Sequence, residues 1–119
     1  MSVTGKVDIM SNLNFNDKGL IPAVVQDADT GDVLMLGYMN EESLRRTLEQ
    51  KEVWFYSRSR QELWHKGATS GNRLKLVSIL VDCEDNSLLV KAHPVGPTCH
   101  TGRKSCFYRT LDEAERKKP

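Results

Sequence analysis

Residues 21–38, IPAVVQDADTGDVLMLGY, contain two β-rich runs on either side of six residues rich in turn formers. The runs are Ile21 to Gln26 and Val33 to Tyr38. Asp and Thr favour turns because their side chains hydrogen-bond to nearby backbone, and Gly because it tolerates positive φ. The stretch therefore predicts a β-hairpin.

A short amphipathic helix is predicted next, from about Glu41 to Gln50. Asn40 is a good N-cap residue, and two glutamates occupy the first turn. Leu44 and Leu48 share one face of such a helix, and Met39 can pack against Leu44 at its start.

Further strands are predicted over Val53 to Tyr56, Leu74 to Cys83 and Leu88 to Ala92. The last two are joined by residues 84–87, a polar turn that leaves Cys83 near the tip of a hairpin. Residues 93–97 contain two prolines and a glycine, so we expect a loop that leads to Cys99.

The fold class expected from these elements is α+β: a strand-rich small single domain with one or two short helices. A chain of 119 residues allows one domain with a modest core, so oligomerisation would help its stability. We expect residues 1–119 to form this one domain, with a core of about 14–109. Residues 110–119 form a highly charged tail or linker.

Composition excludes several classes of function. A formal net charge of +1 lacks the basic excess of a typical nucleic-acid binder. The longest apolar run, Val33 to Leu36, is too short to span a membrane, and Met1 to Asn14 lacks the apolar stretch of a secretion signal. We therefore expect a cytoplasmic protein that does not bind membranes.

Three cysteines, Cys83, Cys99 and Cys106, stand in polar surroundings. An odd number of cysteines without an export signal argues against a disulfide framework. Each cysteine alone could be a small buried hydrophobe, but three beside Asp, Glu, His and Gly favour zinc ligands. Three thiolates would leave the fourth position of a tetrahedral zinc ion open to water.

Oxygen donors surround the first cysteine. In an extended backbone Asp82, Glu84 and Asn86 point to one side, and Cys83 and Asp85 point to the other. The oxygens suit a hard ion such as Mg²⁺, whereas the thiolate suits Zn²⁺. A solvated polar turn is the alternative interpretation of these residues.

The histidine beside the second cysteine is a candidate catalytic group. His100 has two possible roles, a fourth zinc ligand or a general base. Adjacent residues seldom bind the same ion in a tight tetrahedron, so we favour the base. We assign no role in the site to His65 and His93.

Residues 57–60 and 64–73 combine cations with hydroxyls and glycines, as anion-binding loops do. An ordinary exposed basic loop is the alternative. Trp64 can stack on a purine or pack against the protein. The candidate substrate-binding residues, which would bind a phosphorylated purine nucleotide, are Arg58, Trp64, Lys66, Thr69, Ser70 and Arg73.

Four ordered motifs resemble those of phosphoribosyl-AMP cyclohydrolases of histidine biosynthesis, and the resemblance covers almost the whole chain. They are residues 54–60 (WFYSRSR), 63–71 (LWHKGATSG), 82–89 (DCEDNSLL) and 99–107 (CHTGRKSCF). The resemblance implies a homodimeric hydrolase, dependent on Zn²⁺ and Mg²⁺, that opens the adenine ring of N1-(5-phosphoribosyl)-AMP at the N1–C6 bond.

The same resemblance implies the site residues. Zinc would be shared between subunits, with Cys83 of one chain and Cys99 and Cys106 of the other. Magnesium would lie at Asp82, Glu84 and Asn86, although the family commonly has three aspartates at these positions. Glutamate reaches further and asparagine is neutral, so a weaker divalent-ion site is expected.

Two other functions remain as alternatives: a structural zinc-binding adaptor module, and a zinc-dependent purine nucleotide hydrolase of the deaminase type. Family members are often fused to a phosphoribosyl-ATP pyrophosphohydrolase, so the charged tail could be a linker to such a domain.

Overall fold

The computed structural model describes residues 10–116, and residues 117–119 of the expected tail lie outside them. Six strands and two helices are defined in this range. In chain order they are β1 (Ile21–Asp27), β2 (Val33–Met39), α2 (Glu41–Gln50), β3 (Trp54–Ser57), β4 (Glu62–His65), β5 (Leu74–Val81), β6 (Leu88–Pro94) and α3 (Leu111–Arg116).

The strands form a four-stranded sheet in the order β2-β1-β6-β5 and a separate β3–β4 hairpin. β1 pairs antiparallel with β2 and parallel with β6, while β5 and β6 are antiparallel. Both predicted strand pairs are confirmed. β4 was missed, because the sequence predicted no strand over Glu62–His65 and the structure has one there, paired with β3.

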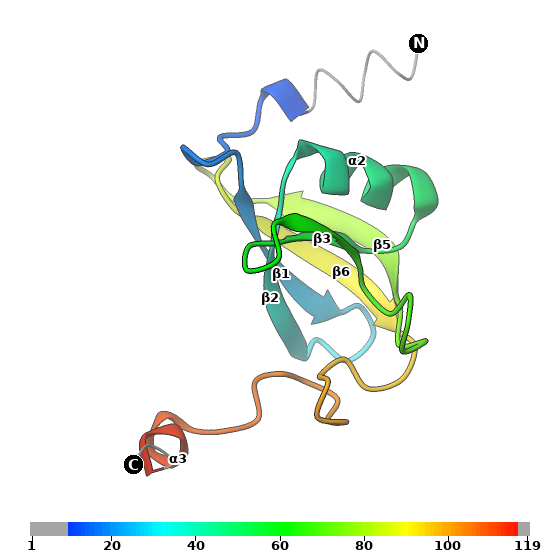
Figure 1. The fold of residues 1–119 in the computed structure, drawn as a ribbon, viewed down its shortest axis with the longest axis vertical. Helices are drawn as coiled ribbons and strands as arrows, with labels where there is room; N and C mark the ends of the chain where they lie inside the picture. The colour runs from blue at the N-terminus through cyan, green and yellow to red at the C-terminus, as the bar shows by residue number, and fades with distance from the viewer. Residues whose placement is uncertain (1–9, 117–119) are drawn as a thin grey trace.

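One face of the sheet carries the core, which follows from strict alternation along β1. Ile21, Ala23 and Val25 are fully buried, as are Val90 and Ala92 of the neighbouring β6. Helix α2 and strand β3 contribute Leu44 and Phe55 to the same core cluster. Figure 1 shows α2 and β3 lying over the sheet.

Gly37 of β2 explains how β3 can lie so close to the sheet. A Cβ at this position would come within 2.6 Å of the Phe55 ring, closer than real contacts allow. Because glycine has no Cβ, the ring packs directly on the β2 backbone and positions the β3–β4 hairpin that follows.

Helix α2 begins where the sequence predicts. The Asn40 side chain accepts a hydrogen bond from the Ser43 amide at 2.8 Å, and Ser43 Oγ accepts one from the Asn40 amide at 2.9 Å. This reciprocal capping box satisfies amide groups that have no partner within the helix.

The chain after β6 leaves the body of the domain. Figure 1 shows it passing beneath the sheet and ending at α3, which stands apart from the strands. The radius of gyration, 15.0 Å, exceeds the ~13.5 Å expected for a compact chain of this length. Among residues 10–116, no helix has the length and apolar character needed to cross a membrane.

Candidate functional site

Cys99 and Cys106 lie in a loop that is attached to the start of β2. Ser105 Oγ donates to the Val33 carbonyl at 2.7 Å, and the Cys106 amide donates to the Leu34 carbonyl at 2.8 Å. These two bonds fix Cys106 against a core strand although the loop has no regular secondary structure.

Backbone bonds within the loop fold it back on itself. The Thr98 amide donates to the Lys104 carbonyl at 3.1 Å, and the Cys99 amide donates to the Arg103 carbonyl at 3.0 Å. The thiols of Cys99 and Cys106 consequently lie close enough for each to influence the pKa of the other. We call these two side chains the thiol pair.

Lys104 fastens the same loop to the β1–β2 turn. Its Nζ lies 2.8 Å from Asp32 Oδ2 and 3.2 Å from Asp27 Oδ2, and it donates to Thr30 Oγ1 at 3.2 Å. The two carboxylates raise the pKa of Lys104. The ammonium therefore stays charged and ties the loop to the sheet.

Asp27 joins the turn to this lysine. Its buried carboxylate accepts the Asp29 amide at 2.8 Å and the Thr30 amide at 3.2 Å. The Asp29 amide is the largest influence on the carboxyl, and together with the Thr30 amide and Lys104 it outweighs desolvation and lowers the pKa to about 2.

The two thiols have different electrostatic surroundings. Thr101 Oγ1 donates to Cys99 Sγ at 3.1 Å, and this bond is the largest cause of a lowered Cys99 pKa. Partial burial raises the pKa of Cys106, and the neighbouring Cys99 raises it further. Cys99 is therefore the thiol that ionises first.

Lys66 lies between the thiol pair and an aromatic ring. Its buried Nζ donates to the Thr98 carbonyl at 2.6 Å and lies 5.3 Å from the centre of the Trp64 ring. Burial lowers the pKa of Lys66, while the two thiols oppose that shift. This lysine, which the sequence suggested for substrate binding, points toward the cysteine loop.

Cys83 is exposed at the tip of the β5–β6 hairpin, as predicted. The strand register puts Leu88, the first residue of β6, at the end of the sheet that carries Cys83. Ala92 pairs with Asp27 at the other end of the sheet, where the thiol pair is attached. The seven residues of β6 thus separate Cys83 from the thiol pair by roughly 20 Å.

The three cysteines therefore do not converge within one chain. Within residues 10–116, no three His, Cys, Asp or Glu side chains gather in a way that could hold a metal ion. The first interpretation of the sequence, one zinc site built by a single chain, does not fit this geometry.

The turn that carries Cys83 is closed by Asp82. Its Oδ1 accepts the Asn86 amide at 2.8 Å and the Ser87 amide at 3.1 Å. Desolvation raises the pKa of Asp82, but these amide bonds outweigh it and the net pKa is lowered. Glu84 and Asn86 are exposed on the same turn.

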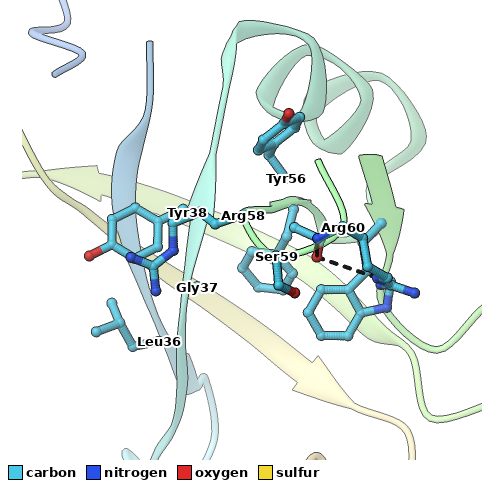
Figure 2. Close-up of a pocket in the computed structure, with 10 residues that line it drawn as sticks. Leu36, Gly37, Tyr38, Tyr56, Arg58, Ser59 and Arg60 are labelled. Atoms are coloured by element: carbon cyan, nitrogen blue, oxygen red, sulfur yellow. Dashed lines mark hydrogen bonds between the residues drawn. The ribbon is translucent and has the colours of Figure 1, made fainter. Parts of the chain in front are cut away.

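An open cavity of about 620 Å³ lies where the β3–β4 turn meets β2. Figure 2 shows Arg58 reaching to one side of it, against Tyr38, and Arg60 reaching to the other. We call it the arginine cavity. Its lining residues are Leu36, Gly37, Tyr38, Phe55, Tyr56, Ser57, Arg58, Ser59, Arg60 and Trp64.

A second cavity, of about 370 Å³, shares Trp64 and Arg60 with the first. Thr69 and Ser70 of the following loop line it, together with Glu62. We call it the loop cavity. Trp64 is half-buried, so its ring both contacts the core cluster and borders the two cavities.

The other candidates have separate surroundings. His100 is exposed next to Cys99, whereas Arg73 lies with its Nε 3.7 Å from a carboxylate oxygen of Glu52. The same Glu52 lies 2.8 Å from His65, whose ring stacks on Trp54. His65 is thus held by structural contacts.

Sequence reasoning missed Lys104, Tyr38 and Arg60. Lys104 contacts Asp32, 72 positions earlier in the chain, and local composition carries no signal of such a pair. Arg60 lies in the basic segment of residues 57–60, so its charge was a usable signal. Tyr38 was interpreted only as a strand residue.

Fold and site together define a small strand-rich α+β domain in which a fixed thiol pair accompanies a basic, aromatic cavity. The model of the phosphoribosyl-AMP cyclohydrolase family matches residues 35–108. The chain belongs to this family, as the sequence motifs predicted.

Relatives of two lengths are similar to the chain. A phosphoribosyl-AMP cyclohydrolase of Clostridium botulinum is 54% identical over 105 residues, covering 87% of this chain and 96% of the relative. One of Listeria monocytogenes is 52% identical over 104 residues, covering 87% and 98%. The histidine biosynthesis bifunctional protein HisIE of Caldanaerobacter subterraneus is 57% identical over 107 residues, covering 90% and 52%.

The chain thus spans about half the length of the bifunctional relative and nearly the whole length of the two cyclohydrolases. The names of these relatives state histidine biosynthesis and phosphoribosyl-AMP cyclohydrolase activity. Both agree with the function predicted from the sequence. The bifunctional relative also supports the prediction that the domain is joined to a second one in some members of the family.

Proposed function

We propose that this chain is a phosphoribosyl-AMP cyclohydrolase, a zinc-dependent cyclic amidine hydrolase. It would open the N1–C6 bond of N1-(5-phosphoribosyl)-AMP to give the phosphoribosylformimino-aminoimidazole carboxamide ribotide, the third step of histidine biosynthesis. The observation that carries the proposal is the thiol pair, which hydrogen bonds from Ser105 and Cys106 hold against β2. The chain that contains it belongs to the cyclohydrolase family.

The residues present fit a zinc ion. Two thiols within reach of each other, one with a lowered pKa, supply two of the soft ligands that zinc prefers. A third thiolate, from Cys83 of a second copy, would leave one position for water. When bound, zinc would lower the pKa of that water and so make it a nucleophile at neutral pH.

The chain's own residues would carry the proton. Water adds to C6 of the purine, and His100, exposed beside Cys99, accepts a proton from it. This proton passes to the exocyclic nitrogen, and the bond from C6 to N1 then breaks as the C6 hydroxyl becomes a carboxamide oxygen and its proton moves to N1. The amino group and both ribose phosphates stay on the product.

We place Mg²⁺ at Asp82, Glu84 and Asn86. Their exposed oxygen donors on one turn support a hard ion. Asp82 already accepts two turn amides, so its carboxylate is held in position before any ion binds. The longer Glu84 and the neutral Asn86 predict weaker affinity than three aspartates would give.

A homodimer is part of this proposal. The distance between Cys83 and the thiol pair requires a second copy if all three bind one ion. An apolar row crosses the sheet face opposite the core, since the register aligns Leu36, Val24, Leu89 and Leu80. Leu36 and Leu80 are about half exposed, and a second copy would cover them.

The free thiols suit the reducing cytoplasm.

Turnover of phosphoribosyl-AMP tests the function directly. We expect the purified protein with zinc to remove the purine absorbance of this substrate without releasing ammonia, and a zinc chelator to stop the reaction. Release of ammonia would identify a deaminase instead. No turnover with zinc, combined with unfolding on zinc removal, would favour a structural zinc module.

A further inference from the structure

The two cavities at Trp64 differ in charge. Arg58 and Arg60 are the charged residues of the arginine cavity, and no carboxylate lines it. In the loop cavity, Arg60 is balanced by Glu62, whose carboxylate lies 3.6 Å away. The charge of the arginine cavity favours binding of a dianionic phosphate, whereas the carboxylate of the loop cavity opposes it.

The Arg58 guanidinium is held without an acidic partner. It lies 4.0 Å from the centre of the Tyr38 ring, and none of the ion pairs among residues 10–116 includes it. Stacking on a ring orients the guanidinium but leaves its N–H donors free for an anion. Figure 2 shows this stack at the edge of the cavity.

Arg60 is oriented from the opposite side. Ser57 Oγ accepts bonds from its amide at 3.3 Å and its Nε at 3.4 Å, and its guanidinium lies 5.9 Å from the Trp64 ring centre. The contact with Glu62 is long and exposed, so a phosphate can compete with it. Two preoriented guanidinium groups on either side of a cavity match the oxygens of a phosphate.

We propose that the arginine cavity binds one of the two phosphates of the substrate through Arg58 and Arg60, with Tyr38 and Ser57 as positioning residues. The loop cavity, lined by Thr69, Ser70 and Glu62, receives neutral hydroxyl groups of the ribose rather than a phosphate. This inference rests on the proposed function for the identity of the substrate. It narrows phosphate recognition from residues 57–60 and 64–73, the two segments that the sequence suggested, to the β3–β4 turn.

The first test is steady-state kinetics with Arg58→Gln and Arg60→Gln. Loss of one charge-assisted bond to phosphate predicts a KM about ten- to hundred-fold higher, with a smaller effect on kcat. Arg45→Gln is the matched control, because Arg45 pairs with Glu42 on α2, away from the cavity. A wild-type KM in both cavity variants would overturn the proposal, and so would an equal change in the control.

Direct binding separates this proposal from the catalytic one. AMP and ribose 5-phosphate each carry one of the substrate's two phosphates, and adenosine and ribose carry none. Calorimetry should show that Arg58→Gln lowers the affinity for one phosphorylated probe about ten- to hundred-fold. The affinity for the unphosphorylated partner of that probe should not change. Equal losses with and without phosphate would contradict a phosphate subsite. If wild-type protein fails to turn over phosphoribosyl-AMP yet binding depends on Arg58 and phosphate, the activity is wrong and the subsite stands.

Discussion

Cys99 illustrates how one neighbouring hydroxyl sets the chemistry of a thiol. The Thr101 hydroxyl donates to its sulfur and stabilises the thiolate, so the pKa of Cys99 lies below its ordinary value. Thr101→Val removes the donor with little change in volume. We expect the pKa of Cys99 to rise, measured in metal-free protein as thiolate absorbance near 240 nm against pH.

The same change should weaken zinc binding at neutral pH, because a higher Cys99 pKa makes its proton harder for zinc to displace. Thr110→Val is the matched control, since the Thr110 hydroxyl contacts Glu113 of α3 rather than a cysteine. An unaltered thiolate titration in Thr101→Val would show that the hydroxyl does not influence Cys99.

At the scale of single residues, the sequence singles out candidates whose own chemistry suggests a role. The cysteines and Arg58 stand out by residue type alone. Lys104 is an ordinary surface cation until the fold puts Asp27 and Asp32 beside it, more than 70 positions away. Long-range pairs of this kind are created by topology, which local patterns do not encode.

Among the elements, helix α2 has the clearest sequence signal. Asn40→Ala removes the side-chain acceptor of the capping box and should lower the free energy of unfolding by about 1 kcal/mol. Urea denaturation at neutral pH measures this difference. Exposed Glu49 gives the control variant Glu49→Ala, for which a much smaller change is expected. Equal effects of the two variants would contradict the role of the cap.

The β1–β2 turn should make stability depend on pH through Asp27. The carboxyl has a folded pKa of about 2 against an ordinary 3.8, so its stabilising contribution is complete above pH ~4 and is lost as pH falls toward 2. Asp27→Asn should therefore reduce the melting temperature more at pH 7 than at pH 3. Asp17→Asn, at an exposed carboxylate, serves as control. A reduction that is the same at both pH values would refute the titration of Asp27 as the cause.

Lys104 connects that turn to the thiol pair. Lys104→Met keeps the length of the side chain but removes the three polar contacts at Asp27, Asp32 and Thr30. We expect zinc affinity, measured by chelator competition, to fall about tenfold or more because the cysteine loop loses its attachment. Lys75→Met, on exposed β5, should bind zinc like the wild type. Unchanged affinity in Lys104→Met would exclude this positioning role.

Elements were predicted where periodicity and turn chemistry agreed, as in β1, β2 and α2. β4 was missed because Glu62 to His65 mixes charged and aromatic residues without a clean alternation. Trp64 of β4 is paired with Phe55 of β3, and Phe55 packs against Gly37 of β2, a contact across the fold. The formation of β4 therefore reflects tertiary packing rather than the intrinsic β-propensity of its residues.

At the scale of the whole molecule, the candidate zinc ligands lie at opposite ends of β6. The sequence correctly put Cys83 at a hairpin tip, and only the strand register shows that the thiol pair is attached at the other end. The exposed Phe107 and Leu111 after the thiol pair add apolar surface to an arm that leaves the domain. A second copy would explain both the separated ligands and this surface.

Mixing two inactive variants tests that arrangement. Cys83→Ala lacks one half of the proposed site, and the double variant Cys99→Ala, Cys106→Ala lacks the other. In a mixed dimer, intact Cys83 of one chain faces the intact thiol pair of its partner, so one of the two sites is restored. After random exchange of equal amounts, half of the dimers are mixed and about a quarter of the wild-type activity should return. A site contained in a single chain would gain nothing from mixing, whereas recovery that rises with the fraction of mixed dimers requires ligands from both subunits.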